Sequence, residues 1–303
     1  MNVKFLKGLV FLSILFLSFV FIQNTAEAET SNSTDDAVIE DTIIQPISVS
    51  VKDQQRLIEL GFTEDEIEVF NQEEYAKYIG LNGTLLESSE SVKEVVVNTL
   101  TGEIVSSEPI PKSEALAKIK LQEAAPEIAQ TCSGQNNCWE QTSWMKLQTT
   151  ASKLSNGRIF LKTSFTWLSR PAVRLTDVVA VTHSPSAVKI PSSDTFSYTY
   201  KDGVGTHSVA PKQIQRTGPG VAARFNLKDI GTNAAPYDHR GYITLQITRE
   251  NNNITKGNAY GHYSHTTVGV ATSVSIASNG VGISIGGVRT SSNMSNPVVL
   301  YYY

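Results

Sequence analysis

The sequence predicts a mainly β protein, with a C-terminal antiparallel β-sandwich (or barrel) of about ten strands preceded by a small acidic helical or α+β segment. Three observations carry this prediction. Short alternating apolar runs separated by turn residues fill residues 132–303, stretches with a helical period are missing there, and acidic residues concentrate before residue 132. Short strand-like runs at close spacing are typical of antiparallel sheets.

One hairpin is especially clear, in the stretch from Thr266 to Val288, where apolar residues alternate with serine on both sides of Asn279-Gly280. Asn-Gly between alternating runs is a strong hairpin signal, because a type I′ turn needs positive φ at both central residues. The predicted pairs are Ser278 with Val281, Ile276 with Ile283, and Val274 with Ile285. This register gathers the large apolar side chains on one face and serine, threonine and glycine on the other.

The first residues have the pattern of a secretory signal peptide. Lys4 and Lys7 precede an apolar run from Leu9 to Ile22, and a small-x-small site ends at Ala28. We therefore expect cleavage after Ala28 and a secreted protein. No later stretch is apolar and long enough to predict a membrane-spanning helix.

Charge divides the remaining chain into two parts. Residues 29–131 carry 21 acidic and 7 basic residues, whereas residues 132–303 carry 7 acidic and 16 basic residues. We predict a signal peptide at 1–28, a flexible leader at 29–47, an acidic helical or α+β segment at 48–131 that is either a pro-region or a permanent small domain, and a basic all-β domain at 132–303. Opposite charge would let the two parts attract each other.

The acidic segment contains helix signals. A capping box is predicted at Thr63 to Glu66, and a similar pattern recurs at Asn71 to Glu74. Residues 95–105 predict a small hairpin that the prolines at 109 and 111 interrupt, and Ser113 is expected to cap a further helix.

Two more tight turns are expected in the basic part. Asn156-Gly157 predicts a pair between Leu154 and Ile159. Asp202-Gly203 predicts that His207 faces Tyr198. Residues 242–248 read as a strand, with residues 258–264 as the expected neighbour across a longer turn.

Cys132 and Cys138 are the two cysteines, separated by five residues of loop-like sequence. In a secreted protein, this spacing predicts a disulfide that closes a small loop. A metal site would need further ligands nearby. His262 and His265 form the closest histidine pair, but residues three apart on a strand point to opposite faces. No metal or cofactor is predicted.

The densest basic and aromatic group is Trp167, Arg170 and Arg174. Arginine and tryptophan together suit anionic groups or the faces of sugars, which makes these three the candidate binding residues. The alternative is a core tryptophan beside two solvated arginines.

Enzymatic signals are weak. Gly282 to Gly286 matches G-x-S-x-G, but Ser284 falls in a predicted strand and no helix former follows it, as a nucleophile elbow requires. Seven acidic residues in the basic part offer no reason to choose a catalytic pair. The sequence favours a non-enzymatic protein.

We therefore expect a secreted protein whose basic domain binds an anionic cell-wall, glycan or lipid surface, with the acidic segment masking it until cleavage near residues 124–131. No nucleic-acid motif is found, so nucleic acid is not expected as a partner. One alternative is a membrane-active toxin or antimicrobial precursor, because the hairpin at 266–288 alternates apolar and small polar residues. Its apolar stretches are short for spanning a bilayer. A second alternative is an extracellular hydrolase.

Overall fold

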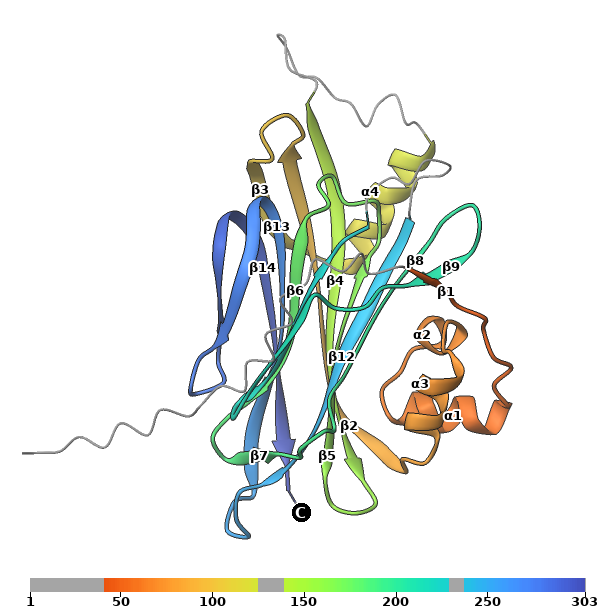
Figure 1. The fold of residues 1–303 in the computed structure, drawn as a ribbon, viewed down its shortest axis with the longest axis vertical. Helices are drawn as coiled ribbons and strands as arrows, with labels where there is room; N and C mark the ends of the chain where they lie inside the picture. Colours follow the sequence, from red (N-terminus) through yellow and green to blue (C-terminus); the bar gives the residue numbers. More distant parts are fainter. Residues whose placement is uncertain (1–40, 125–138, 229–236, 303) are drawn as a thin grey trace, which may run out of the picture.

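The computed structural model describes residues 41–124, 139–228 and 237–302, which form two antiparallel sheets facing each other (Figure 1). The predicted mainly β fold is confirmed, in its sandwich form. The nine-stranded sheet contains β1 (Thr42–Ile43), β2 (Gly83–Asn98), β3 (Ile104–Ile110), β4 (Glu140–Leu154), β5 (Ile159–Trp167), β7 (Ala187–Lys189), β8 (Thr195–Lys201), β9 (Thr206–Ser208) and β12 (Tyr237–Arg249). The five-stranded sheet contains β6 (Thr176–His183), β10 (Gln213–Thr217), β11 (Gly220–Asn226), β13 (Lys256–Ile276) and β14 (Ile283–Tyr301).

The strands of the larger sheet follow the order β1-β9-β8-β12-β5-β4-β2-β3, with β7 also paired to β12. The smaller sheet has the order β10-β11-β6-β13-β14. The predicted pairing of residues 258–264 with residues 242–248 is wrong, because β13 pairs with β6 and β14 whereas β12 lies in the other sheet. A turn between consecutive strands thus crosses from one sheet to the other.

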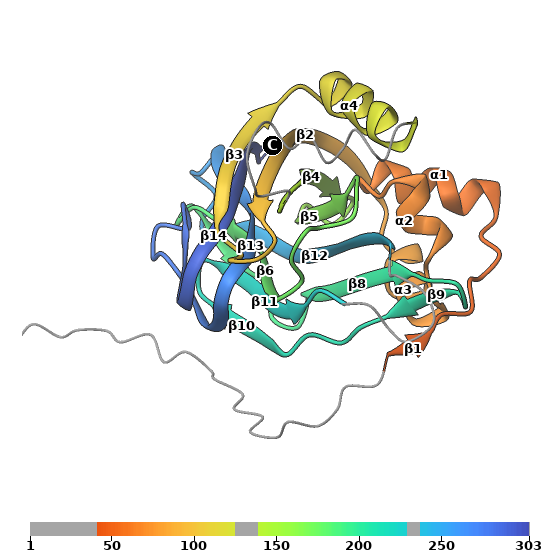
Figure 2. The same cartoon turned by 90° about the horizontal axis from the view of Figure 1, so that it is seen from above.

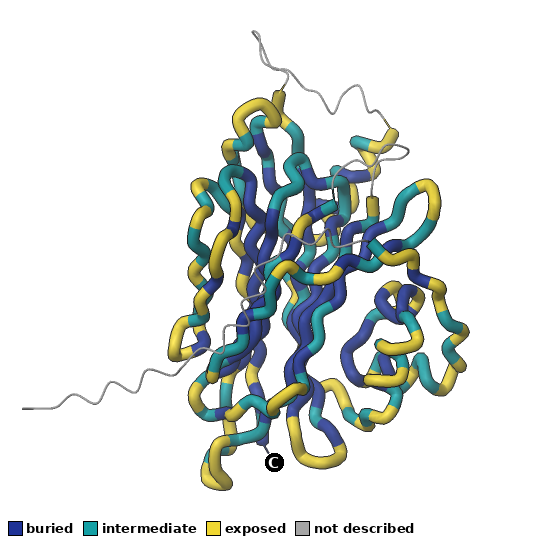
Figure 3. Tube along the Cα trace, viewed as in Figure 1, coloured by how far each residue is buried: buried dark blue, intermediate teal, exposed yellow. Residues whose placement is uncertain are grey.

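The main core lies between the two sheets and is formed by buried residues from both. Figure 3 shows the buried stretches gathered where the sheets face each other. Phe165 of β5 stacks on Phe225 of β11, with ring centroids 5.2 Å apart, and Tyr263 of β13 approaches Phe165 to 4.8 Å. Aromatic rings thus join the sheets in their middle. Burial of apolar and aromatic side chains between the sheets is the main source of stability in a sandwich.

Three short helices cover the outer face of the larger sheet, on the side away from the main core (Figure 2). They are α1 (Val51–Glu59), α2 (Glu64–Glu68) and α3 (Gln72–Ile79). Both predicted capping boxes are present, at Thr63 and at Asn71. Phe62 and Tyr78 pack against Phe160 and Tyr242 of the sheet, so helices too short to stand alone are held by aromatic contacts.

A buried ion pair also joins the helices to the sheet. Lys162 of β5 is fully buried and contacts the carboxylate of Glu66 in α2. Its ammonium nitrogen lies 4.8 Å from the centre of the Phe62 ring. Burial lowers the pKa of Lys162, against the opposing effect of Glu66. Glu66 therefore both caps α2 and supplies the counter-charge that keeps this lysine inside the fold.

The acidic segment also contributes an interior strand to the larger sheet. Strand β2 pairs with β4 from Gly83 to Asn98, and with β3 on its other side. Helix α4 (Lys112–Ala124) packs on the outside of β2 through Ala115 and Ile119, which contact Trp144 of β4. Pro109 does not interrupt β3, because this strand lies at the edge of the sheet, where a missing N–H is tolerated. The helix begins at Lys112, one residue before the expected cap.

Opposite charges meet where the acidic and basic parts touch. Lys146 lies 3.8 Å from Glu90, Arg240 lies 3.4 Å from Asp65, and Lys228 pairs with Asp41. Trp144 Nε1 also donates to a Glu94 carboxylate oxygen at 2.8 Å. These contacts accord with the attraction expected from the charge asymmetry.

The sandwich is closed along one edge by side-chain hydrogen bonds between β2 and β14. Ser91 Oγ donates to Asn296 Oδ1 at 2.7 Å, and Lys93 Nζ donates to the Asn293 carbonyl at 2.6 Å. Asn296 Nδ2 reaches the carbonyl of Leu147 at 2.8 Å. We call this edge the β2–β14 seam; it joins residues about 200 positions apart in the chain.

Two predicted turns are displaced in register. Leu154 pairs with Arg158 and not with Ile159, because the turn has three residues and Gly157 takes positive φ (82°). Tyr200, not Tyr198, faces His207, and their rings stack with centroids 4.8 Å apart. Here Asp202 accepts hydrogen bonds from the N–H groups of residues 204 and 205, which moves the turn by one position.

None of the helices within the described ranges has the length and apolar character needed to cross a membrane.

Candidate functional site at the folded-back hairpin

The hairpin of β13 and β14 is bent sharply back on itself. From Lys256 paired with Tyr301 to Thr266 paired with Ser291, the two strands keep one register. The register then shifts, and a second paired stretch runs from Ser273 with Gly286 to Ile276 with Ile283. We call residues 273–286 the distal hairpin. Its predicted pairs are confirmed for Val274 with Ile285 and for Ile276 with Ile283.

Glycines form the bend. Gly269 and Gly287 have φ of 95° and 81°, a region that other residues enter only with strain. A Cβ on Gly287 would lie 2.4 Å from the carbonyl oxygen of Val270, so the backbones also approach too closely for a larger residue. The type I′ turn predicted at the tip is wrong, because it needs positive φ at both central residues. Gly280 has φ of 71°, but Asn279 is not among the residues with positive φ. The N–H of Ala277 donates to the carbonyl of Gly282 at 2.9 Å, which closes a four-residue loop.

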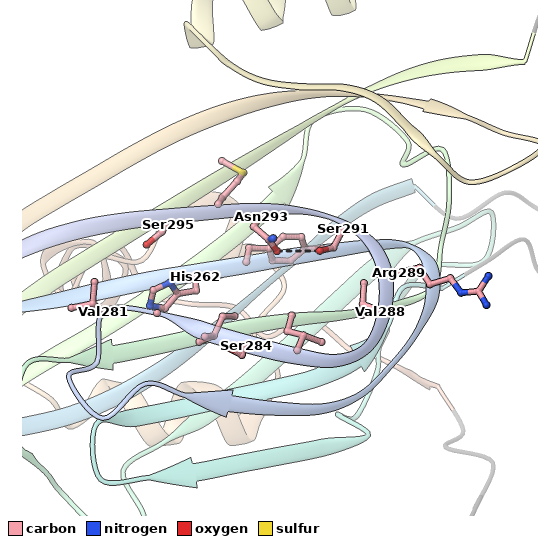
Figure 4. Close-up of a pocket in the computed structure, with 13 residues that line it drawn as sticks. His262, Val281, Ser284, Val288, Arg289, Ser291, Asn293 and Ser295 are labelled. Atoms are coloured by element: carbon pink, nitrogen blue, oxygen red, sulfur yellow. Dashed lines mark hydrogen bonds between the residues drawn. The ribbon is translucent and has the colours of Figure 1, made fainter.

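The tip rests on the end of β6. Thr182 Oγ1 donates to the carbonyl of Gly280, and a Cβ on Gly280 would lie 2.0 Å from the carbonyl oxygen of His183. Because His183 pairs with Ala259 near the start of β13, the distal hairpin runs back over the outer face of its own sheet (Figure 4).

The distal hairpin covers that face with a modest apolar contact. Val274 is 7% exposed and packs with Val178, Ala180 and Ala222, which present small side chains from β6 and β11. Further aliphatic residues are only partly buried there: Ile276, Ile283 and Ile285 of the distal hairpin, and Val288 at the bend. Arg224 of β11 holds the bend by donating to the carbonyl of Ala271 at 3.0 Å.

Polar side chains of β13 lie on the same covered face. Ser264 and His262 pair with Val178 and Ala180, and paired residues of antiparallel strands project from one face. The hydroxyls of Ser264 and Thr266 are buried and have no hydrogen-bond partner within the described ranges. His262 Nε2 lies 3.0 Å from Thr182 Oγ1, and burial lowers the pKa of His262 to about 4. At neutral pH the His262 imidazole on the covered face is therefore uncharged.

A groove of about 550 Å³ follows the side of the distal hairpin. One wall is aliphatic and consists of Val281, Ile283, Ile285 and Val288. The floor is the outer face of β14 and presents polar side chains, among them Ser291, Asn293 and Ser295 (Figure 4). Arg289 borders the groove, but its guanidinium points away from the other labelled side chains. The groove joins an apolar wall to an uncharged floor of hydroxyls and an amide.

The candidate residues from the sequence lie elsewhere. Trp167 is 4% exposed in the main core, and its Nε1 donates to Tyr263 Oη at 3.1 Å. A surface ligand would not reach this ring, so the three residues do not form one binding surface. Arg170 accepts a hydrogen bond from Gln141 through its carbonyl, and both Arg170 and Arg174 are half-buried. A binding role for these two arginines stays a prediction.

Trp167 belongs to a buried polar network around Asp177. Tyr263 Oη donates to Asp177 Oδ2 at 2.6 Å, and the N–H of Thr266 donates to Asp177 Oδ1 at 3.0 Å. His265 Nδ1 lies 3.0 Å from the same carboxylate. His265 thus points into the core while His262 points to the covered outer face, which is the opposite-face arrangement predicted for this pair. Among the described residues, no group of three potential metal ligands gathers.

Cys132 and Cys138 lie outside the described residues, so their disulfide stays a prediction. Ser284 pairs with Ser275 in the distal hairpin, in strand geometry and not on a strand-to-helix elbow. Sequence reasoning missed the groove residues of β14. Their signal was the alternation of Ser291, Asn293 and Ser295 with residues that point inward.

Comparisons with known proteins give little likeness. No protein-family model matches the sequence, and the search of curated proteins finds no match. Among solved structures, the collagen-binding domain of the Erysipelothrix rhusiopathiae surface protein RspB is similar at a TM-score of 0.26 and 6% identity, over 51% of this chain and 65% of that one. The chain therefore spans just under two thirds of that domain.

Two further structures show similarity of the same order. A structure of Gaeumannomyces graminis manganese lipoxygenase with part of Komagataella pastoris zonadhesin is similar at a TM-score of 0.26 and 5% identity, over 73% of this chain and 86% of that one. AvmM, described as catalysing macrocyclization in alchivemycin A biosynthesis, is similar at a TM-score of 0.19 and 12% identity, over 46% of this chain and 79% of that one. At these scores, none of the three supports a functional argument.

Proposed function

We propose that the protein is secreted, has no enzymatic activity, and binds an uncharged glycan outside the cell through the groove beside the distal hairpin. The observation that carries this proposal is the chemistry of the groove. Sugars offer hydroxyls along their edges and C–H groups on their faces, and the floor and the aliphatic wall match these two surfaces. Ligand sites commonly combine apolar walls with a few polar groups that fix orientation.

The charges of the basic part favour a glycan over an anionic surface. Lys146 and Arg240 are each paired with a carboxylate of the acidic segment, Lys228 is paired with Asp41 just before that segment, and Lys162 is buried with Glu66. Paired cations contribute less to long-range attraction than free ones. The acidic segment would then act as a permanent neutralising part of the fold, and not as a sheath that is removed to expose charge.

The direct test is binding of soluble neutral polysaccharides and purified cell-wall glycan by titration calorimetry. Asn293→Leu keeps the size of the side chain but removes the amide from the groove floor. We expect about tenfold weaker binding, because the facing sugar hydroxyl loses its partner. Asn252→Leu, at an exposed turn outside the groove, is the matched control and should bind normally.

Two results would refute the glycan proposal. One is equal affinity of the two variants for every neutral glycan that the wild type binds. The other is binding restricted to acidic polymers and abolished by salt, which would indicate screened charge attraction in place of the groove.

Secretion is tested by the intact mass of the protein from culture medium. We expect a chain that begins at Glu29, lighter by two hydrogens than the reduced form because Cys132 and Cys138 are joined. A mass that includes the first 28 residues would contradict secretion by this route. Labelling of both cysteines by iodoacetamide before reduction would contradict the disulfide.

A further inference from the structure

We propose that the distal hairpin is a lipid-docking element, released from its sheet by acid and able to enter a bilayer surface through its apolar face. This activity goes beyond the proposed glycan binding, although Val281, Ile283 and Ile285 of the same hairpin also form the wall of the groove. The chemistry of the hairpin is the first argument: residues 266–288 contain no charged side chain, and the first charge beyond them is the cation Arg289. Released, the hairpin would show an aliphatic face opposite serines and glycines, and such an amphipathic element partitions to the lipid interface.

Exposure of the hairpin is the second argument. Val270 at the bend is 53% exposed, and Val281 near the tip of the distal hairpin is 49% exposed. An exposed apolar element without charges is poorly suited to water and to the polar rims of protein interfaces. A bilayer surface fits it better, since aliphatic side chains enter the acyl region and Arg289 could meet lipid phosphates.

The closed position is weakly held, which is the third argument. Covering the sheet leaves the hydroxyls of Ser264 and Thr266 buried without a hydrogen-bond partner in the described ranges. Each buried hydroxyl of this kind opposes closure, because release would return it to water. The facing residues Ala180 and Ala222 are small, and the bend at Gly269 and Gly287 provides two positions that can change conformation freely. The hairpin can therefore leave without unfolding the sandwich.

His262 supplies the response to acid. The groups that face it are uncharged: the Thr182 hydroxyl from β6, the Gly280 backbone from the tip, and the Tyr260 ring on its own strand. Two further basic groups lie nearby: His183 at the end of β6, whose pKa is also lowered by burial, and Arg289, which borders the adjoining groove. Among the described residues, no carboxylate pairs with His262 to stabilise its protonated form.

The sign of the pH effect follows from the lowered pKa. The closed form binds a proton on His262 only near pH 4, whereas an open form would bind it near the ordinary value of 6.5. The closed position of the distal hairpin therefore becomes less stable as the pH falls from about 6.5 toward about 4. Linkage predicts an opening equilibrium about thirtyfold larger at about pH 5 than at about pH 7.5.

Flotation with phosphatidylcholine vesicles tests the proposal on the full secreted chain. Gly280→Ala forces the tip away from the His183 carbonyl, and Gly282→Ala is the matched control because no atom lies within 4 Å of its added Cβ. We expect Gly280→Ala to bind vesicles at neutral pH and Gly282→Ala to bind only in acid. Hydrogen exchange of residues 273–286 should be faster in the first variant, which shows release independently of lipid.

His262→Gln tests the trigger, because glutamine stays neutral. Wild type should bind the vesicles about thirtyfold better at about pH 5 than at about pH 7.5, and His262→Gln should lose most of this difference. Faster exchange in Gly280→Ala without vesicle binding would overturn the proposal. So would wild-type binding that does not change with pH, or that occurs only on anionic phosphatidylglycerol vesicles. Asn293→Leu should leave vesicle binding intact, which separates this result from the glycan test.

Discussion

A chain that begins at Cys132 is expected to be insoluble, because the acidic segment supplies part of the sheet on which the basic part is built. Without β2, the long edge of β4 loses its hydrogen bonds from residues 140 to 154. An open edge of this length is a template for aggregation. The aromatic side chains of Phe160 and Tyr242 would also lose the helices that cover them. Soluble yield and near-ultraviolet circular dichroism, compared with the chain from Glu29, measure the effect.

A cut within residues 125–138 has a different expected result. The two fragments should stay together on a sizing column, since β2 remains hydrogen-bonded between β3 and β4 whether or not the chain is continuous. A folded, soluble domain of residues 132–303 alone would contradict this view and restore the acidic segment as a removable pro-region.

Glu66→Gln is expected to lower the free energy of unfolding by about 3–5 kcal/mol, which is the usual cost of leaving one member of a buried ion pair without the other. Glutamine can still cap α2, so the loss would come from Lys162, which is fully buried. Urea denaturation at neutral pH gives the value. Glu64→Gln, on the exposed side of the same helical turn, is the control and should change stability little.

The same variant has a characteristic pH dependence. Burial already lowers the pKa of Lys162, because the low-dielectric interior disfavours its charged form. Without Glu66, stability should rise as the pH rises through the folded pKa toward the unfolded value of 10.5. Adding Lys162→Met should restore most of the lost stability at neutral pH, because an apolar side chain needs no counter-charge. If the double variant is no more stable than Glu66→Gln alone, the buried charge is not the cause.

Local signals in the sequence predicted local structure well. The capping boxes at Thr63 and Asn71 were identified because both partners of each box lie within four residues. The pairing of Ile276 with Ile283 was correct because the alternation on both sides of the turn fixes it. Leu154 was assigned the wrong neighbour because a glycine at positive φ can end either a two-residue or a three-residue turn, and sequence spacing does not distinguish them.

Long-range pairing could not be read in the same way. The first half of strand β2 contains a continuous polar run, residues 87–91, which does not predict a strand. Its sheet partner β4 and its seam partner β14 lie far away in the chain, so its place inside the sheet depends on contacts that no short window contains. Gly286-Gly287 was a visible signal for the bend of the hairpin. The small residues that the distal hairpin packs against, however, are alanines of β6 and β11, which are distant in the sequence. The candidate groove was therefore outside the reach of sequence reasoning, as was the burial of Trp167.

The β2–β14 seam has a consequence for how the molecule folds. Ser91 must find Asn296, so the sandwich cannot close until two ends of a long chain segment have met. Such contacts form slowly, because closing a large loop costs conformational entropy before the stabilising contacts are made. During that interval the apolar inner faces of the two sheets would be open to other chains. The order of events during folding, more than final stability, then governs how much of this protein reaches its native state.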